Sequence, residues 1–245
     1  MENTQLIGLS RQVALRRELD VIANNLANME TAGFKRHNVM FEEYLMPVAE
    51  YGDVRRDRPL SYVHDRATIR DFQPGAFEQT GNNLDVAIRG DAWFAIETEN
   101  GERYTRNGAF TIDANGFLTQ HTGELVLGED GPIAVPEDAP DIAIARDGTI
   151  SADGEILGTL RVVSFDNQRD MKAIGNNFFE SEAPPQPAEG VVIQQGMLEG
   201  ANVEGVLEMA RMIEVTRAYS SITRSLDRVD QLRRDAIERL GTAPS

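Results

Sequence analysis

Apolar side chains near the N-terminus of this 245-residue chain recur with a helical period. Between Thr4 and Asn28 there is no proline, and apolar positions alternate at spacings of four and three. These positions are Leu15, Leu19, Ile22 and Leu26. The pattern predicts an amphipathic helix of about 25 residues. It ends near Asn28 and Gly33, two residues that readily take the left-handed conformation found at helix C-termini.

A longer pattern of the same kind occupies the C-terminal part of the chain. From Val203 to Leu240 there is no proline, and no glycine follows Gly205. Apolar residues alternate at spacings of three and four along one stripe. They are Met212, Val215, Tyr219, Ile222, Leu226 and Val229. The stripe predicts a helix of about 35 residues and roughly 50 Å, which exceeds the width of a small domain.

Between residues 75 and 194 the period changes to two. Residues 84–88 alternate between apolar and polar, and Trp93 to Ile96 form a second candidate strand. Residues 142–145 and 159–165 are further candidates, and six Asn-Gly or Asp-Gly pairs lie between positions 100 and 154. The pattern predicts a β-rich domain. The proline-rich residues 183–187 predict an extended linker that leaves it.

Residues 36–74 carry no comparable signal. Val39 to Met46 are compatible with a short helix, and Tyr51 to Arg70 show no clear period. We expect an extended connecting arm here. The predicted fold class is α+β, with long N- and C-terminal α-helices (residues 1–35 and 195–245) pairing as a coiled-coil-like axial domain and a central β-rich domain at residues 75–194.

Composition and charge narrow the possible functions. Hydrophobic residues make up 41% of the chain and charged residues 26%, which is typical of a folded protein. The net charge is −16, and residues 75–190 contribute 7 basic and 21 acidic groups to it. This acidic middle argues against a nucleic-acid partner. No apolar run approaches the ~18–20 residues of a membrane span, so we expect no membrane insertion, and no Sec-type signal is recognisable.

The sequence shows no arrangement of residues typical of an enzyme. There is no cysteine, the three histidines are scattered, and no nucleotide-binding or hydrolase motif occurs. Asp113-Ala114-Asn115-Gly116 resembles the start of a calcium loop, but its glycine is misplaced and the closing glutamate is missing. A hairpin turn is the better interpretation. We therefore predict no catalytic residue, no cofactor and no metal.

The two end helices are the stronger signal. Each stripe is narrow, as in a coiled coil, so we expect the helices to meet each other and neighbours in an assembly. A lone stripe buries too little apolar surface to offset the ordering cost, which predicts mobile ends before assembly. The amides of Asn24, Asn25 and Asn28 are expected to cap helix ends or to bond across subunits, with solvent exposure as the alternative.

Three segments carry a family resemblance. Residues 22–28 read Ile-Ala-Asn-Asn-Leu-Ala-Asn, and residues 31–36 read Thr-Ala-Gly-Phe-Lys-Arg. Residues 90–96 and 104–116 form a second segment around Trp93, and residues 196–203, Gly-Met-Leu-Glu-Gly-Ala-Asn-Val, begin a third. In this order they resemble the bacterial flagellar rod and hook proteins. Ala92 and Thr216 stand where the family usually has glycine and glutamine.

The resemblance implies a structural subunit of the flagellar basal-body rod, which crosses the periplasm. The chain length and compact middle favour the proximal-rod type over the longer hook protein, and we prefer it to the distal-rod type. Family resemblance further implies that the end helices form the inner tube of a helical assembly. The implied partners are other proximal and distal rod proteins and the type III flagellar export apparatus, which would export the chain without a Sec signal.

The resemblance and the helical stripes together predict an assembly interface on the two helices and the motif that follows the first. Its predicted residues are Leu15, Leu19, Ile22, Asn24, Asn25, Leu26, Asn28, Gly33, Phe34, Met212, Val215, Tyr219, Ile222, Leu226 and Val229. The alternatives are a distal-rod protein of the same family and, in a different class, a free-standing extracellular β-domain binding module with helical stalks.

Overall fold

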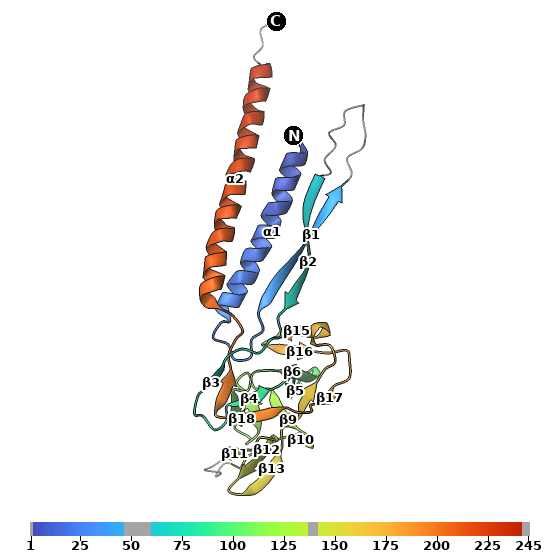
Figure 1. Cartoon of the computed structure of the whole chain (residues 1–245), viewed down its shortest axis with the longest axis vertical. Helices are drawn as coiled ribbons and strands as arrows, with labels where there is room; N and C mark the ends of the chain where they lie inside the picture. The colour runs from blue at the N-terminus through green and yellow to red at the C-terminus, as the bar shows by residue number, and fades with distance from the viewer. Residues whose placement is uncertain (1, 47–59, 137–141, 242–245) are drawn as a thin grey trace. The chain divides into compact units, whose positions relative to one another are not determined.

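The computed structural model of this chain describes residues 2–46, 60–136 and 142–241. The chain divides into two compact units, which Figure 1 draws in one colour scale along the sequence. The first unit comprises residues 1–27, 37–70 and 204–245, and the second comprises residues 28–36 and 71–203.

Two long helices dominate the first unit and lie side by side (Figure 1). Helix α1 spans Glu2–Ala27 and helix α2 spans Gly205–Gly241, with 26 and 37 residues respectively. Both predicted helices and their pairing are confirmed, as is the α+β fold class. Neither described helix combines the length and apolar character needed to cross a membrane.

A β-hairpin completes the first unit, where the sequence predicted a short helix within a connecting arm. Strand β1 (His37–Met46) pairs antiparallel with β2 (Leu60–Arg70), and both strands contact α1. The helix expected at residues 39–46 was therefore wrong. An isolated helix of that length is marginal, whereas pairing with β2 gives β1 a ladder of backbone hydrogen bonds along one edge. Residues 47–59 of the predicted arm lie outside the described residues.

The second unit is built almost entirely of short antiparallel strands, as the turn signals predicted. Its strands are β3 (Phe77–Gln79), β4 (Val86–Arg89), β5 (Trp93–Thr98), β6 (Gly101–Thr105), β7 (Phe110–Ile112), β8 (Leu118–Gln120), β9 (Leu125–Gly128), β10 (Gly131–Pro132), β11 (Ile142–Ile144), β12 (Thr149–Ala152), β13 (Glu155–Thr159), β14 (Val162–Ser164), β15 (Lys172–Gly175), β16 (Phe178–Glu180), β17 (Gln186–Pro187), β18 (Val192–Gln195) and β19 (Met197–Glu199). A short 3₁₀ helix spans Gln168–Asp170. The largest sheet runs in the order β15-β16-β6-β5-β9-β8-β7, and smaller sheets pair β11-β12-β13, β18-β4 and β19-β3.

Strand β5 lies at the centre of this unit and is buried on both faces. Phe94 belongs to one hydrophobic cluster, together with Phe110, Leu118 and Ile150. Trp93 belongs to a second cluster on the opposite face, where its ring lies 4.8 Å from that of Phe179. Because successive side chains of a strand point to opposite faces, the part of the strand between the two clusters, residues 93–96, is apolar at every position.

Two further sequence predictions concern a hairpin turn and a proline-rich linker in the second unit. Asp153-Gly154 links β12 to β13 with positive φ at both residues, as expected for a two-residue hairpin turn. The predicted linker at residues 183–187 was wrong in part, because Gln186 and Pro187 form β17 and pair with β14. Proline is tolerated in an edge strand, where its missing N–H faces outward.

The unit boundaries differ from the predicted domain limits at residues 36–74 and 195–203. Residues 28–36 and 195–203 belong to the β-rich unit rather than to the helical one, and the hairpin of β1 and β2 belongs with the helices. Hydrogen bonds within the β-rich unit explain the first difference. The backbone N–H of Gly33 donates to the carbonyl of Glu199 at 2.7 Å, and that of Gly200 donates to Ala76 at 2.8 Å.

Gly33→Ala should strongly destabilise the second unit. Gly33 has φ of +67°, and a Cβ atom there would lie 2.5 Å from the backbone carbonyl carbon of Arg106. The backbone conformation alone costs about 1–2 kcal/mol for a residue with a side chain, and the contact adds to it. Gly81→Ala is the matched control, because Gly81 has φ of +76° and open space around it. Thermal unfolding should show a larger loss for Gly33→Ala, and equal losses would contradict the close contact.

Candidate functional site

Polar contacts fix the antiparallel register of α1 and α2. Glu18 Oε1 accepts a hydrogen bond from Arg211 Nε at 3.0 Å, and Gln12 Nε2 donates to the hydroxyl of Thr223 at 3.2 Å. A further hydrogen bond joins Arg233 to Gln5. These contacts extend along nearly the whole of α1, so the two helices pair over its length (Figure 1).

The two predicted stripes line this pairing. Leu15, Leu19, Ile22 and Leu26 continue the same helix face as Gly8 and Gln12, which contact α2. Ile22 is 1% exposed and Val215 is 6% exposed. The other predicted stripe residues are half-buried and keep part of their surface accessible. They are Leu15, Leu19, Leu26, Met212, Tyr219, Ile222, Leu226 and Val229.

Glycine at position 8 allows one close contact in the pair. A Cβ atom on Gly8 would lie 2.6 Å from Cδ2 of Leu226, so the leucine side chain rests on the bare helix backbone. Each stripe thus partly covers the other within the chain, as the predicted pairing of the two helices requires.

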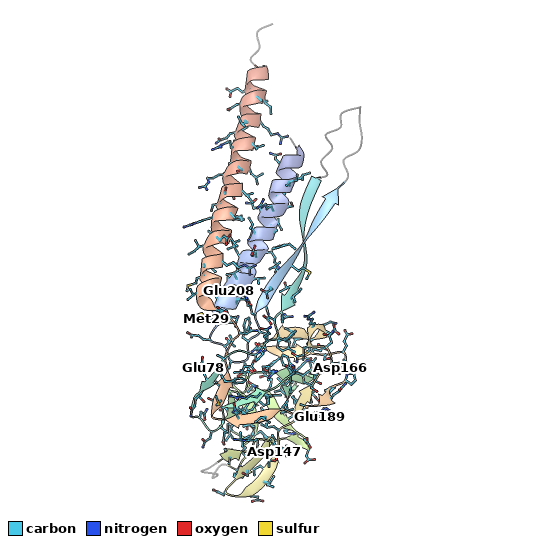
Figure 2. The ribbon with its side chains drawn as sticks, viewed as in Figure 1. Met29, Glu78, Asp147, Asp166, Glu189 and Glu208 are labelled. Atoms are coloured by element: carbon cyan, nitrogen blue, oxygen red, sulfur yellow. The ribbon has the colours of Figure 1, made fainter. Side chains whose placement is uncertain are left out.

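Asn25 has a distinct role within the helical unit. Its side-chain oxygen accepts a hydrogen bond from the backbone N–H of His37, and its amide nitrogen donates to the carbonyl of the same residue, both at 2.9 Å. The amide nitrogen also lies 3.5 Å from a carboxylate oxygen of Glu208. Asn25 and Glu208 are each 1% exposed. One amide therefore joins α1, the start of β1 and the start of α2, where Glu208 is labelled in Figure 2.

The remaining predicted interface residues lie elsewhere. Asn24 is on the exposed side of α1. Asn28, Gly33 and Phe34 belong to the β-rich unit, where the carbonyl of Asn28 accepts from the N–H of Thr31 at 3.1 Å and Phe34 is buried. The structure therefore brings the stripe residues and Asn25 together, but it does not place these last three with them.

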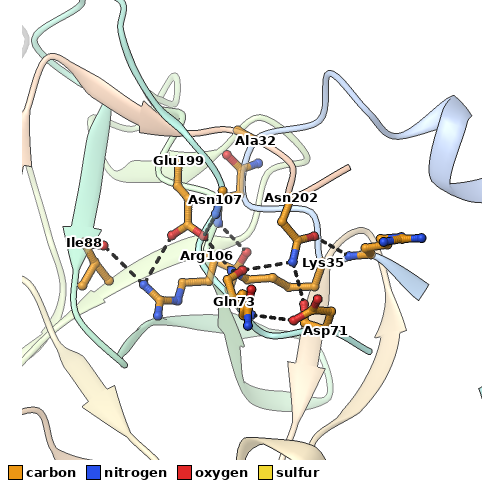
Figure 3. A network of polar contacts seen from close by, with 12 residues as sticks. Ala32, Lys35, Asp71, Gln73, Ile88, Arg106, Asn107, Glu199 and Asn202 are labelled. Atoms are coloured by element: carbon orange, nitrogen blue, oxygen red, sulfur yellow. Dashed lines mark hydrogen bonds and ion pairs between the residues drawn. The ribbon is translucent and has the colours of Figure 1, made fainter. Parts of the chain in front are cut away.

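A buried ionic network holds the β-rich unit together at these residues (Figure 3). Glu199 receives Lys35 Nζ at 2.6 Å on one carboxylate oxygen and Arg106 Nη1 at 3.4 Å on the other. All three side chains are at most 2% exposed. The network joins residues 35, 106 and 199, which are far apart in the sequence, and we call it the Glu199 clasp.

Backbone groups complete the clasp. Arg106 donates to the carbonyl oxygens of Ile88 and Gly90 at 3.3 and 2.6 Å. Lys35 donates to the carbonyl of Gln73 at 2.9 Å. Burial is the main cause that lowers the pKa of Lys35 and of Arg106, and the Glu199 carboxylate opposes it in both. The Glu199 carboxylate is therefore the main countercharge of both buried cations.

Asn202 adds a second clamp in the same unit. Its side-chain oxygen accepts from the backbone N–H of Arg36 at 2.6 Å, and its amide nitrogen donates to the carbonyls of Asp71 and Gln73 at 2.8 and 3.0 Å (Figure 3). The segment that follows α1 and the segment that precedes α2 are thereby fixed to the same stretch of residues 71–73.

Sequence reasoning did not single out the clasp or Glu208. Lys35, Arg106, Glu199 and Asn202 all lie inside the segments quoted for the family resemblance, which was the available signal. A charged residue amid glycines and apolar residues in each segment could have suggested burial. Their pairing could not be read from spacing, because the partners are separated by 93 to 164 positions.

The candidate calcium loop is a turn in the structure. One carboxylate oxygen of Asp113 accepts from the backbone N–H groups of Asn115 and Phe117 at 2.9 and 2.7 Å. These bonds lower the pKa of Asp113, the bond from Phe117 most. In the described part of the chain no group of three or more histidine and acidic side chains is arranged to hold a metal.

Comparison with known proteins finds family matches in both units. Residues 6–35 match the family described as "Flagella basal body rod protein", and residues 194–239 match "Flagellar basal body rod FlgEFG protein C-terminal". Residues 87–152 match "Flagellar hook protein FlgE/F/G D1 domain". The flagellar basal-body rod protein FlgF of Caulobacter vibrioides is 36% identical over 98% of this chain and 99% of its own length. The chain belongs to the FlgE/F/G family of flagellar hook and basal-body rod proteins.

Other relatives support the same assignment. FlgF of Escherichia coli is 37% identical over 86% of this chain and 87% of its own length. The basal-body rod protein FlgG of Agrobacterium fabrum is 34% identical over 89% of this chain and 92% of its own length. This flagellar rod family is structural rather than enzymatic. The first and last family matches cover most of the two helices, and both contain residues of the Glu199 clasp.

Glu199→Gln should destabilise the β-rich unit of this rod-family chain by roughly 3–5 kcal/mol, because it removes the main countercharge of two buried cations. Urea unfolding followed by the fluorescence of Trp93, the single tryptophan, measures this directly, since the Arg106 guanidinium lies 5.4 Å from its ring. Glu182→Gln is the control, because its pair with Lys172 is exposed, and it should leave the midpoint unchanged. Equal midpoints for both variants would show that the clasp does not stabilise this unit.

The helical unit should lose stability in mild acid through His37. Its Nε2 accepts a hydrogen bond from Arg70 Nε at 3.1 Å, and burial together with the Arg70 charge lowers the pKa of His37 to about 4. Because the unfolded chain binds this proton near pH 6.5, the contribution is complete above that pH and declines as the pH falls toward 4.

Helical circular dichroism in urea at several pH values tests this pH dependence. His37→Gln should flatten the decline between pH 6.5 and 4. His121→Gln, which alters an exposed imidazole, should leave it as in the natural chain. An unchanged decline in His37→Gln would assign the acid sensitivity to other groups.

Proposed function

We propose that this chain is a structural subunit of the proximal rod of the flagellar basal body and that the α1–α2 pair is its polymerising element. One observation carries the proposal. The apolar seam between the helices is completed only in part within the chain, since eight of its residues stay half-buried. A neighbouring subunit packed alongside would remove the remaining apolar surface from water, at about 25 cal/mol per Å².

The seam residues and Asn25 would contribute to this assembly in different ways, according to how deeply each is buried within the helix pair. Ile22, Asn25 and Val215 are already buried and hold the pair together. The half-buried residues, such as Leu19 and Leu226, form the part that neighbours cover. In the other unit, Gly33 and Phe34 act indirectly, by fixing the segment that follows α1.

Relatives favour the proximal rod over the distal rod. The FlgF proteins of C. vibrioides and E. coli are 36% and 37% identical to this chain, whereas the FlgG protein of A. fabrum is 34% identical. As partners we propose other proteins of the proximal and distal rod, in a helical array of head-to-tail contacts. We also propose that the type III flagellar export apparatus delivers the chain.

Leu226→Asp should prevent rod assembly. Leu226 lies on Gly8 within the seam, so a carboxylate there loses about 1.5–3 kcal/mol of apolar burial and adds a desolvation cost at every copy. In the isolated protein it should lower helical content while Trp93 fluorescence reports an unchanged β-rich unit. Electron microscopy of basal bodies and a swimming assay measure the effect on assembly.

Asp227→Ala is the matched control, because Asp227 is exposed and about 100° around the helix from Leu226. Cells with this variant should swim. Intact rods and normal swimming with Leu226→Asp would refute the seam as an assembly interface. Secretion and folding of the β-rich unit should be normal in both variants.

A further inference from the structure

Each helix of the pair carries an exposed apolar patch outside the seam. On α1 the patch consists of Leu6, Leu9 and Val13, which are 52%, 53% and 60% exposed. On α2 it consists of Val206, Met209 and Ile213, which are 75%, 47% and 55% exposed. We call them the α1 patch and the α2 patch. Both have the spacing i, i+3, i+7, so each forms a straight stripe over two helical turns.

Neither patch takes part in the pairing of the two helices. On α1 the contacts to α2 come from Gln5, Gly8, Gln12 and Glu18, and the exposed α1 patch lies beside this face and outside it. On α2 the seam residues Val215 and Leu226 lie on a different face from the α2 patch. The apolar character is local, because the same outer faces continue with the exposed polar residues Asp20 on α1 and Arg224 on α2.

The two patches lie at different heights along the pair. Since Leu226 rests on Gly8, the α1 patch is level with about residue 225 of α2. Met209 is about 15 residues from that level, or ~23 Å at 1.5 Å per residue. Two apolar stripes that lie outside the seam and at different heights do not meet within one chain, but they can meet between two copies.

We propose that the α2 patch of one copy packs on the α1 patch of a second copy, which is displaced by ~23 Å along the helix axis. The inference rests on the proposed function, since it takes the helix pair as the polymerising element. The contact is heterologous, because each copy uses a different patch on each side, and such contacts continue into a helical array.

Matching spacing and charge identify a second copy as the occupant. When two copies point the same way, α2 of one runs antiparallel to α1 of the other, so Val206 approaches Val13 and Ile213 approaches Leu6. Arg16 follows the α1 patch and Glu204 precedes the α2 patch, and both are exposed. The antiparallel alignment brings this opposite pair to the same end of the contact, where it favours one register.

Engineered disulfides test the contact without background, since the chain has no cysteine. The double variant Leu9→Cys with Met209→Cys, as the sole copy in the cell, should give disulfide-linked multimers of this chain when purified basal bodies are oxidised. A disulfide requires Cα atoms within about 7 Å, so it reports a direct contact. Leu9→Cys with Asp227→Cys is the control. Asp227 lies on the same face of α2 as Met209 but five turns further along, and it is level with Leu9.

The staggered contact predicts disulfide-linked multimers for Leu9→Cys with Met209→Cys, and none for Leu9→Cys with Asp227→Cys. Three results would overturn this inference and leave the proposed function standing. Rods that contain the chain could give no disulfide-linked multimers, the control could give multimers as well, or the links could form only to another rod protein. Absence of the natural chain from basal bodies would overturn both.

Charge reversal provides a second test if the cysteine variants build no rods. Arg16→Glu should reduce swimming, and Glu204→Arg in the same chain should restore it, because the double change rebuilds the opposite pair between copies. Failure of the second change to rescue the first would overturn the staggered contact.

Discussion

Glu199 is the group on which the β-rich unit depends. Its carboxylate balances two cations that are as fully buried as the apolar core, and these three side chains come from the segment after α1, the middle of the unit and its last strand. A buried charge without its partner is costly, so the three segments are fixed together or not at all. The residues that lead out of α1 and into α2 are thus fixed in one folded body, and only a few residues separate these anchored segments from each helix. Short tethers of this kind give the two helices a high effective concentration for each other.

The helical unit also depends on a single buried polar residue. One amide, that of Asn25, satisfies both backbone groups of His37 and approaches Glu208, so helix, hairpin and second helix share a single buried junction. The seam beyond it is half-buried along most of its length. A pair of helices cannot enclose a core, since each seam side chain meets a partner on only one side. The pair is therefore well formed and still has apolar surface to bury, which is the property that an assembling subunit needs.

Local pattern was sufficient to predict both helices, the β-rich character of the middle of the chain and four of its strands, β4, β5, β11 and β14. The alternating spacing from Leu15 to Leu26 and from Met212 to Val229 survives in the structure because the seam itself imposes it. The pattern failed where a distant partner decides the conformation. Residues 39–46 became a strand because residues 60–70 pair with them, and Gln186 and Pro187 became an edge strand through β14. The Glu199 clasp and the two apolar patches could be identified only in the folded structure. Residue spacing alone predicts neither the partner of Lys35 nor the exposure of Met209.

The position of Glu199 in the sequence has a consequence for the timing of folding. Synthesis runs from the N-terminus, so Lys35 and Arg106 are made long before the carboxylate that neutralises them, and the contact spans 164 positions. Until residue 199 has been synthesised, folding of this unit would bury two cations without their main countercharge. The free-energy cost of that burial opposes early collapse. The buried network of this unit can therefore be completed only after residue 199 has been synthesised.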